Sequence, residues 1–226
     1  MPTLLIADDH PLFRAALRGA AIDAAPDTKT CEAGSLDEVI ATLEAQGDID
    51  LVLLDLHMPG NHGLAGLAAI RAQFPAVAVV LVSANEDPRI VRRALDHGAA
   101  GYIPKSASLD EMRDAIRCVL ACEQWLPPAL RGAVARAASA PADANLAARL
   151  ASLPPQQFRV LVLVAQGLLN KQIADRLDVQ ERTVKAHLST IFEKLGARNR
   201  TQASVILREL EITDSARQVP AIDQPA

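Results

Sequence analysis

The chain has 226 residues, of which 50% are apolar and 3% are aromatic, and its formal net charge is −4. This length is sufficient for two domains with separate hydrophobic cores. The sequence excludes an apolar run of about 18 residues that could span a membrane, and the acidic Asp8 and Asp9 exclude the basic start of a signal peptide. Three cysteines without metal-site spacing are expected to be reduced thiols, so we expect a cytoplasmic protein.

The first 122 residues predict an alternation of short buried strands with helices. Most of the expected strands are brief apolar runs, residues 29–33 being the exception, and the helices carry start or stop signals such as Pro11, Ser35 and Gly98. The expected strands are residues 3–7, 29–33, 50–54, 77–83 and 101–103, and the expected helices are residues 11–25, 36–46, 63–73, 88–97 and 108–122. Because no hairpin signals separate the strands, the pattern predicts a five-stranded parallel sheet covered on both faces.

Polar side chains stand where four of these strands end. They are Asp8 and Asp9 after the first strand, Asp55 after the third, Ser83 after the fourth and Lys105 after the fifth. Because parallel strands end at one edge of a sheet, we expect these side chains to lie together. Clustered carboxylates are stabilised by a shared cation, and Mg²⁺ is usually held by carboxylates, waters and phosphate oxygens. A hydroxyl and an ammonium beside that metal favour a phosphoryl group. The histidines show no ligand spacing.

The second half of the chain has a different composition and charge. Residues 1–120 contain 17 Asp and Glu against 10 Lys and Arg, whereas residues 153–208 contain 4 against 9. A basic segment joined to an acidic one predicts different partners and favours a polyanion for the second, although a solvated helix surface would have a similar charge. Residues 123–148, which are rich in Ala and interrupted by Pro, are expected to form a linker. Leu146, Leu150 and Leu153 recur at helical spacing, which predicts a short helix leading into the second domain.

Residues 149–212 predict a small all-α domain of four helices. The expected helices are residues 156–166, 171–177, 181–195 and 201–210, with Asn170 as the N-cap of the second. The middle two helices, which are separated by a short turn, predict a helix-turn-helix. The second of them presents five side chains near its N-terminal half, where recognition helices contact bases: Arg182, Thr183, Lys185, Ala186 and Ser189. Residues 213–226 are expected to be a disordered tail.

Residues 1–120 resemble the receiver domain of bacterial two-component response regulators. The motifs are Asp8-Asp9, Asp55-x-x-Met58-Pro59-Gly60, Ser83-Ala84 and Gly101-Tyr102-Ile103-x-Lys105. The resemblance implies a flavodoxin-like fold in which Asp55 accepts a phosphoryl group from a sensor histidine kinase. It also implies that Asp8, Asp9, Asp55 and the backbone carbonyl of His57 bind Mg²⁺, that Ser83 and Lys105 contact the phosphoryl group, and that Tyr102 is a rotating aromatic side chain coupled to Ser83. The side chain of His57 is expected to be a surface histidine.

Residues 153–210 resemble the LuxR/NarL-type DNA-binding domain. The motifs are the run from Gln166 to Ala174, Thr183-Val184-Lys185-x-His187 and Lys194-Leu195-Gly196. The resemblance implies that Lys185 and its neighbours contact promoter DNA, that residues 201–210 form a dimer surface, and that His187 supports the domain from inside. The sequence departs from the family at three places. Gln157 and Arg159 stand where an acidic residue is usual, Gln180 replaces a Ser or Thr cap, and Ser189 replaces a basic residue.

The combined expectation is a response regulator without enzymatic turnover or membrane contact, which binds promoter DNA as a homodimer when Asp55 is phosphorylated. One alternative is a regulator whose receiver binds proteins without phosphate. Another is a Mg²⁺-dependent aspartyl phosphatase, but such enzymes need a second Asp at the position of His57. A third is a ligand-sensing LuxR-type regulator, which the few aromatic residues in the N-terminal half disfavour. The sequence leaves open whether phosphorylation promotes dimerisation or releases the recognition helix.

Overall fold

The computed structural model describes residues 1–61, 63–137 and 141–208. Five parallel strands form one sheet in the order β2-β1-β3-β4-β5, which confirms the predicted sheet. The strands are β1 Thr3–Ala7, β2 Lys29–Ala33, β3 Leu51–Asp55, β4 Ala78–Ser83 and β5 Gly101–Pro104. From β1 the chain adds β2 on one side of the sheet and then β3, β4 and β5 on the other, so the direction of strand addition reverses between β1 and β3. A sheet of this kind has its ligand site at the carboxyl ends of the strands, beside that reversal.

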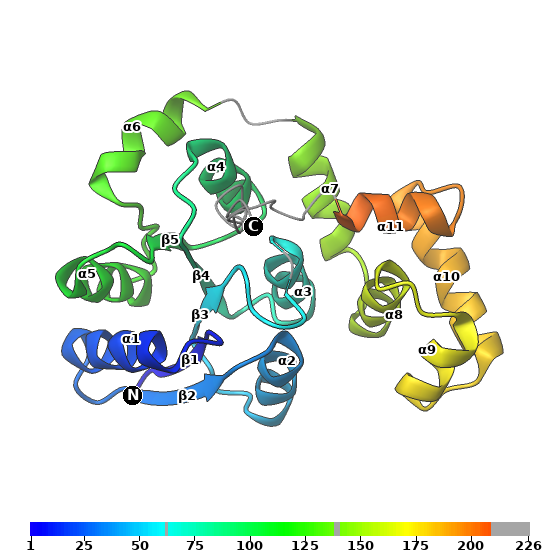
Figure 1. The fold of residues 1–226 in the computed structure, drawn as a ribbon, viewed down its shortest axis with the longest axis horizontal. Coiled ribbons are helices and arrows are strands. Elements are labelled where there is room, and N and C mark those ends of the chain that lie inside the picture. The colour runs from blue at the N-terminus through cyan, green and yellow to red at the C-terminus, as the bar shows by residue number, and fades with distance from the viewer. Residues whose placement is uncertain (62, 138–140, 209–226) are drawn as a thin grey trace, which may run out of the picture.

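Helices cover both faces of the sheet, as Figure 1 shows. The helices of this domain are α1 Pro11–Ala24, α2 Leu36–Ala45, α3 Ala65–Gln73, α4 Pro88–Asp96 and α5 Leu109–Leu120. Successive strand residues point to opposite faces, so Leu5 packs in the core under α2, α3 and α4, whereas Leu4 and Ile6 pack under α1 and α5. This alternation explains why strands buried on both faces are apolar throughout.

Helix α5 ends at Leu120, two residues before the predicted end. Cys122 adopts φ +63, in the left-handed region, and its backbone N–H donates to the carbonyl of Val119. The next amide, that of Glu123, donates to the carbonyl of Cys118, which closes the helix in a Schellman-type turn. Because the residue after such a helix end is usually glycine, a cysteine there gave no signal in the sequence. Cys118 and Cys122 are free thiols, as expected, and so is Cys31.

Trp125 extends the sheet beyond β5. Its backbone N–H donates to the carbonyl of Ala100, and its carbonyl accepts from the N–H of Tyr102. Gly101 lies between them, where an added Cβ would approach the Trp125 carbonyl oxygen to 2.9 Å. The buried indole of Trp125 packs in the core under α5. The edge strand of the sheet is therefore covered by the start of the segment that leads to the second domain.

The segment predicted as a linker contains helical structure that packs on the receiver. Helix α6 Pro128–Arg136 packs against α4, and α7 Pro141–Ala151 packs against α3 and α4. Leu150 and Leu153 are buried, which agrees with the predicted helix leading into the second domain. A cavity of about 300 Å³ lies between α2 and α3 on one side and α8 and α9 on the other. Ion pairs of Arg159 with Glu44 and of Arg176 with Asp37 cross between the domains.

Within the described residues, the second domain is formed by four helices, which lie beside the receiver in Figure 1. They are α8 Pro155–Ala165, α9 Asn170–Leu177, α10 Glu181–Leu195 and α11 Arg200–Arg208. Their buried apolar residues belong to the same cluster as those under α2, α3 and α4, so the two domains do not have separate cores as expected. Asn170 is the first residue of α9 rather than its N-cap, and its side-chain oxygen accepts from Arg200. The predicted tail at residues 213–226 lies outside the described residues. Within the described ranges, no helix is both long and apolar enough to cross a membrane.

Candidate functional sites

The carboxyl ends of β1 and β3 bring an acidic cluster together. Ala7 pairs with Leu54 across these neighbouring strands, so Asp8 and Asp55 leave the sheet side by side. Asp8 is 0% exposed and Asp55 is 1% exposed, whereas Asp9 lies at the surface. One ligand atom from each of Asp8, Asp9, His10 and Asp55 lies within 4.8 Å of the others. The predicted meeting of these carboxylates at one sheet edge is confirmed.

Lys105 provides the positive charge that faces the two buried carboxylates. Its Nζ lies 2.8 Å from Asp8 Oδ2 and 3.0 Å from Asp55 Oδ2, and it also lies over the ring of Phe13. The backbone N–H of Lys105 donates to the carbonyl of Ser83 at 2.7 Å, which extends the pairing of β4 with β5. The ion pairs of the ammonium and the backbone pairing of Lys105 with β4 therefore both hold it at the pocket.

The electrostatics of the pocket disfavour the charged form of the Asp55 carboxylate. Burial raises the pKa of Asp55 above its ordinary value; the hydrogen bond and charge of Lys105 act to lower it, and the charge of Asp8 raises it. Burial acts to lower the pKa of Lys105, but the hydrogen bonds to Asp8 and Asp55 together with the charges of these carboxylates outweigh it, so that its pKa is raised. Lys105 therefore remains a cation, and its charge only partly offsets the cost of burying the Asp55 carboxylate.

The donor set fits a hard divalent cation. Carboxylate oxygens are the ligands that Mg²⁺ prefers in proteins, and Mg²⁺ retains several waters beside them. Asp55 Oδ1 accepts from the backbone N–H of His57 at 3.2 Å, so the backbone of His57 lies beside the carboxylate. The His57 side chain is half-buried rather than at the surface. The role of its carbonyl as a ligand stays a prediction.

Ser83 and Tyr102 both bond to the backbone of Asn85. Ser83 Oγ accepts from the Asn85 N–H at 3.1 Å, and the Tyr102 hydroxyl donates to the Asn85 carbonyl at 2.6 Å. Tyr102 is fully buried, so its ring lies inside the domain. Asn85 therefore joins Ser83 to Tyr102. The sequence analysis did not identify Asn85, because it belongs to neither of their motifs.

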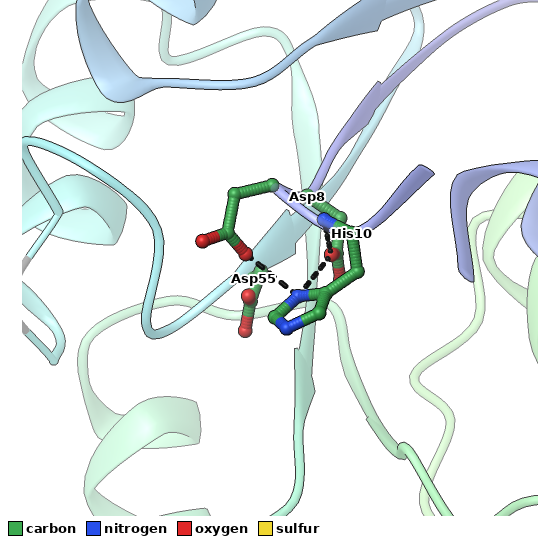
Figure 2. Close-up of side chains that lie close together, drawn as sticks. Asp8, His10 and Asp55 are labelled. Carbon is green, nitrogen blue, oxygen red and sulfur yellow. Dashed lines mark hydrogen bonds and ion pairs between the residues drawn. The ribbon is translucent and has the colours of Figure 1, made fainter. Parts of the chain in front are cut away.

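Two further residues of the pocket were missed by the sequence analysis. Asn61 is buried; its Nδ2 donates to the carbonyl of Asp55 at 2.7 Å, and its Oδ1 accepts from the N–H of Gly66 at 2.9 Å. It therefore fixes the loop between β3 and α3. His10, for which no ligand spacing was expected, lies beside the acidic cluster, and its Nδ1 is 3.1 Å from Asp8 Oδ1 and 2.7 Å from Asp9 Oδ1 (Figure 2).

The predicted DNA-contacting residues lie on one side of α10. Arg182, Lys185, Ala186 and Ser189 are exposed and Thr183 is half-buried. The opposite side is the apolar stripe Val184, Leu188, Ile191 and Leu195, which packs in the core of the domain. Lys185 forms an ion pair with Glu181 at 2.9 Å, and no side-chain bond from Gln180 caps the helix. His187 is half-buried.

The fold and these two sites define a phosphoryl-receiver type of domain joined to a helix-turn-helix. Comparison with known proteins supports both halves. Residues 4–117 match the response regulator receiver domain family, and residues 151–207 match the luxR family of bacterial regulatory proteins. The chain belongs to the family of DNA-binding transcriptional response regulators of the NarL/LuxR type. Proteins of this family are transcriptional regulators rather than enzymes, and their receiver domains bind Mg²⁺ at an acidic pocket.

Similar proteins match over nearly the whole chain. A glycerol metabolism activator of Pseudomonas putida is 39% identical over 96% of this chain and 100% of its own length. The nitrate/nitrite response regulator NarL of Escherichia coli K12 is 34% identical over 93% of this chain and 96% of its own length. A solved structure of RcsB dimers bound to DNA is similar in fold, with a TM-score of 0.54 and 22% identity over 91% of this chain and 97% of that one.

Proposed function

We propose that Asp55 is the residue through which this regulator is switched, by accepting a phosphoryl group from a phosphohistidine on a sensor histidine kinase. The observation that supports this proposal is the position of Asp55, a buried carboxylate at the end of β3 with Lys105 Nζ at 3.0 Å. An Asp55 oxygen forms a bond to phosphorus while the P–N bond breaks, and the electron pair of that bond returns to the imidazole. Lys105 compensates the negative charge on the phosphoryl oxygens.

We propose that Asp8, Asp9, Asp55 and the His57 carbonyl hold Mg²⁺ during this reaction. When bound, Mg²⁺ would neutralise charge on the carboxylates and on the phosphoryl oxygens. Asp8 is fully buried and Asp9 is exposed, so Asp9 is the carboxylate through which a hydrated cation can enter. Lys105 already provides one positive charge in the pocket, which a divalent cation would supplement on the side of Asp9.

The path from Asp55 to the rest of the domain runs through Asn85. A phosphoryl group adds nearly two negative charges and strong acceptor oxygens, which attract the Ser83 hydroxyl. If Ser83 turns toward that group, its oxygen leaves the N–H of Asn85, whose carbonyl holds the Tyr102 hydroxyl. Asn85 lies just before α4, and its side-chain oxygen accepts from the N–H of Asp87, the N-cap of that helix. Phosphorylation would thereby displace the start of α4.

We propose that α10 binds promoter DNA through Arg182, Thr183, Lys185, Ala186 and Ser189, and that the active form is a homodimer. The receiver packs against the second domain through α7 and α8. Arg182, Lys185 and Ser189 remain exposed in this arrangement. Because these side chains are already accessible to DNA, we favour dimerisation over release of the recognition helix as the effect of phosphorylation. Promoter DNA as a partner also implies that the protein acts in the cytoplasm.

The test combines phosphorylation, assembly and DNA binding in one series. Wild type and Asp55→Asn would be incubated with Mg²⁺ and acetyl phosphate and then examined by intact mass, by light scattering and by titration with promoter DNA. We expect a gain of one phosphate, a dimer and tighter DNA binding for wild type alone. Modification of Asp55→Asn would refute the site. Tighter binding by wild type without any change in assembly would favour release of the recognition helix instead. Unmodified wild type with unchanged DNA binding would make the receiver a phosphate-independent protein-binding module.

A further inference from the structure

His10 lies where a further metal ligand could stand. Its Nδ1 is 2.7 Å from Asp9 Oδ1 and 3.1 Å from Asp8 Oδ1, and one nitrogen of its ring lies within 4.8 Å of the ligand oxygens of the three aspartates. Figure 2 shows the imidazole directed toward the carboxylates rather than away from them. These two distances show that the ring nitrogen already reaches the oxygens that would hold a cation.

The backbone keeps His10 at this rim. His10 is the N-cap of α1, its N–H donates to Asp8 Oδ1 at 2.7 Å, and Pro11 begins the helix. Its Cα position is therefore set by the turn between β1 and α1, whereas its side chain is 58% exposed and can turn about χ1. The ring can change its angle to the carboxylates without any movement of the sheet.

His10 and Lys105 approach Asp8 from different oxygens. His10 Nδ1 is beside Oδ1, whereas Lys105 Nζ is beside Oδ2 at 2.8 Å and reaches on to Asp55 Oδ2. A cation held by Asp8 Oδ1, Asp9 and the imidazole would therefore leave the ammonium in place for the phosphoryl group.

We infer that His10 is a nitrogen ligand that gives this pocket a binding mode for Mn²⁺ and similar transition ions besides Mg²⁺. Mg²⁺ is bound almost entirely by oxygen, so the imidazole adds little to its affinity. Imidazole is a better ligand for first-row transition ions than for Mg²⁺. The gain is smallest for Mn²⁺, which favours oxygen, and larger for Ni²⁺ and Zn²⁺. This inference rests on the proposed function for the location of the metal, and it adds that His10 makes the pocket selective.

The test is pulsed EPR of the full-length protein with Mn²⁺, with the histidines labelled with ¹⁵N in a second sample. We expect a nitrogen coupling that changes with the label in wild type and is lost in His10→Gln. The control His187→Gln alters a histidine of α10 in the second domain, away from the acidic pocket, and should retain the coupling. In titrations, His10→Gln should weaken Ni²⁺ binding roughly tenfold and Mn²⁺ binding by less, and it should change Mg²⁺ binding less than about twofold.

Three outcomes separate the possibilities. A Mn²⁺ signal without histidine coupling in wild type would overturn the inference. Equal losses of Ni²⁺ and Mg²⁺ affinity in His10→Gln would also overturn it, because His10 would then only position the carboxylates. Phosphorylation of wild type and of His10→Gln by acetyl phosphate with Mg²⁺, measured by intact mass, tests the proposed function independently. Wild type that gains phosphate but shows no histidine coupling would refute the role of His10 alone.

Discussion

The acidic pocket and the recognition helix each place a lysine beside a carboxylate, but in opposite environments. Lys105 lies 3.0 Å from Asp55, whose side chain is almost completely buried. Lys185 lies 2.9 Å from Glu181, and both side chains are largely exposed. The distances are nearly equal, so solvent makes the difference. A buried charge depends on its partner, whereas an exposed pair is screened and contributes little. The pair of Lys105 and Asp55 is therefore suited to a switch, whereas Lys185 can leave Glu181 and bind a DNA phosphate instead.

Removing Lys105 should produce the largest effect. Lys105→Met leaves the buried carboxylates of Asp8 and Asp55 without their cation, and we expect it to lower the free energy of unfolding by about 3 kcal/mol in the absence of divalent cations. Urea denaturation measures this loss, and added Mg²⁺ should restore part of it by supplying positive charge. Lys185→Met is the matched control and should change stability by less than about 0.5 kcal/mol. Equal losses in the two variants would contradict the contrast between the two pairs.

Neutralising Asp55 should stabilise the apo protein. Burial raises the pKa of this carboxyl, so its ionised form disfavours folding at pH values above the folded-state pKa, and Asp55→Asn should raise stability by roughly 1 kcal/mol there. The advantage should disappear as the pH falls through that raised pKa, because the wild-type carboxyl then becomes protonated. Thermal unfolding without divalent cations, from about pH 8 down to the ordinary aspartate range near pH 4, measures this dependence. A stabilisation that grows toward low pH would contradict the sign.

On the recognition helix, a lysine substitution should affect DNA binding rather than folding. Lys185→Ala should weaken binding to promoter DNA roughly tenfold and reduce the slope of log affinity against log salt by about one. Glu181→Gln is the matched control, because it frees Lys185 from its ion pair and should tighten binding slightly. Fluorescence anisotropy at several salt concentrations measures both. An unchanged slope for Lys185→Ala would remove Lys185 from the DNA contacts.

The smallest effect is expected at the interdomain pair of Arg159 and Glu44. Both side chains are partly exposed, so Arg159→Ala should cost less than about 1 kcal/mol, and the loss should shrink as salt is added. A double-mutant cycle with Glu44→Ala, followed by thermal unfolding, isolates the pair. A coupling energy as large as the effect of Lys105→Met would show that this exposed pair is as strong as the buried pairs of Lys105. Arg159 stands where related domains usually carry an acidic residue, so the cycle also tests whether that departure serves this contact.

Much of the receiver could be predicted from the sequence because its signals are local. The apolar runs specified the strands, and the topology of parallel strands brought Asp8, Asp55, Ser83 and Lys105 to one edge. Capping residues were equally informative, since Ser35 Oγ accepts from the N–H of Glu38 at the start of α2 as expected. Helix α10 ends at the predicted residue because Gly196, at φ +64, closes it. It also begins at the predicted residue, although no side chain caps that end.

The sequence by itself determined the two folds and the residue types at each site, because strand periodicity, caps and chain order are properties of neighbouring residues. Only the tertiary structure decided how Asn85 joins Ser83 to Tyr102, and how Trp125 covers the edge of β5. It also decided that α6 and α7 pack on the receiver. These contacts join separate segments or depend on side-chain direction, which composition and spacing do not encode. His10 shows this most clearly: its position beside Asp9 was evident from the sequence, but the direction of its ring was not.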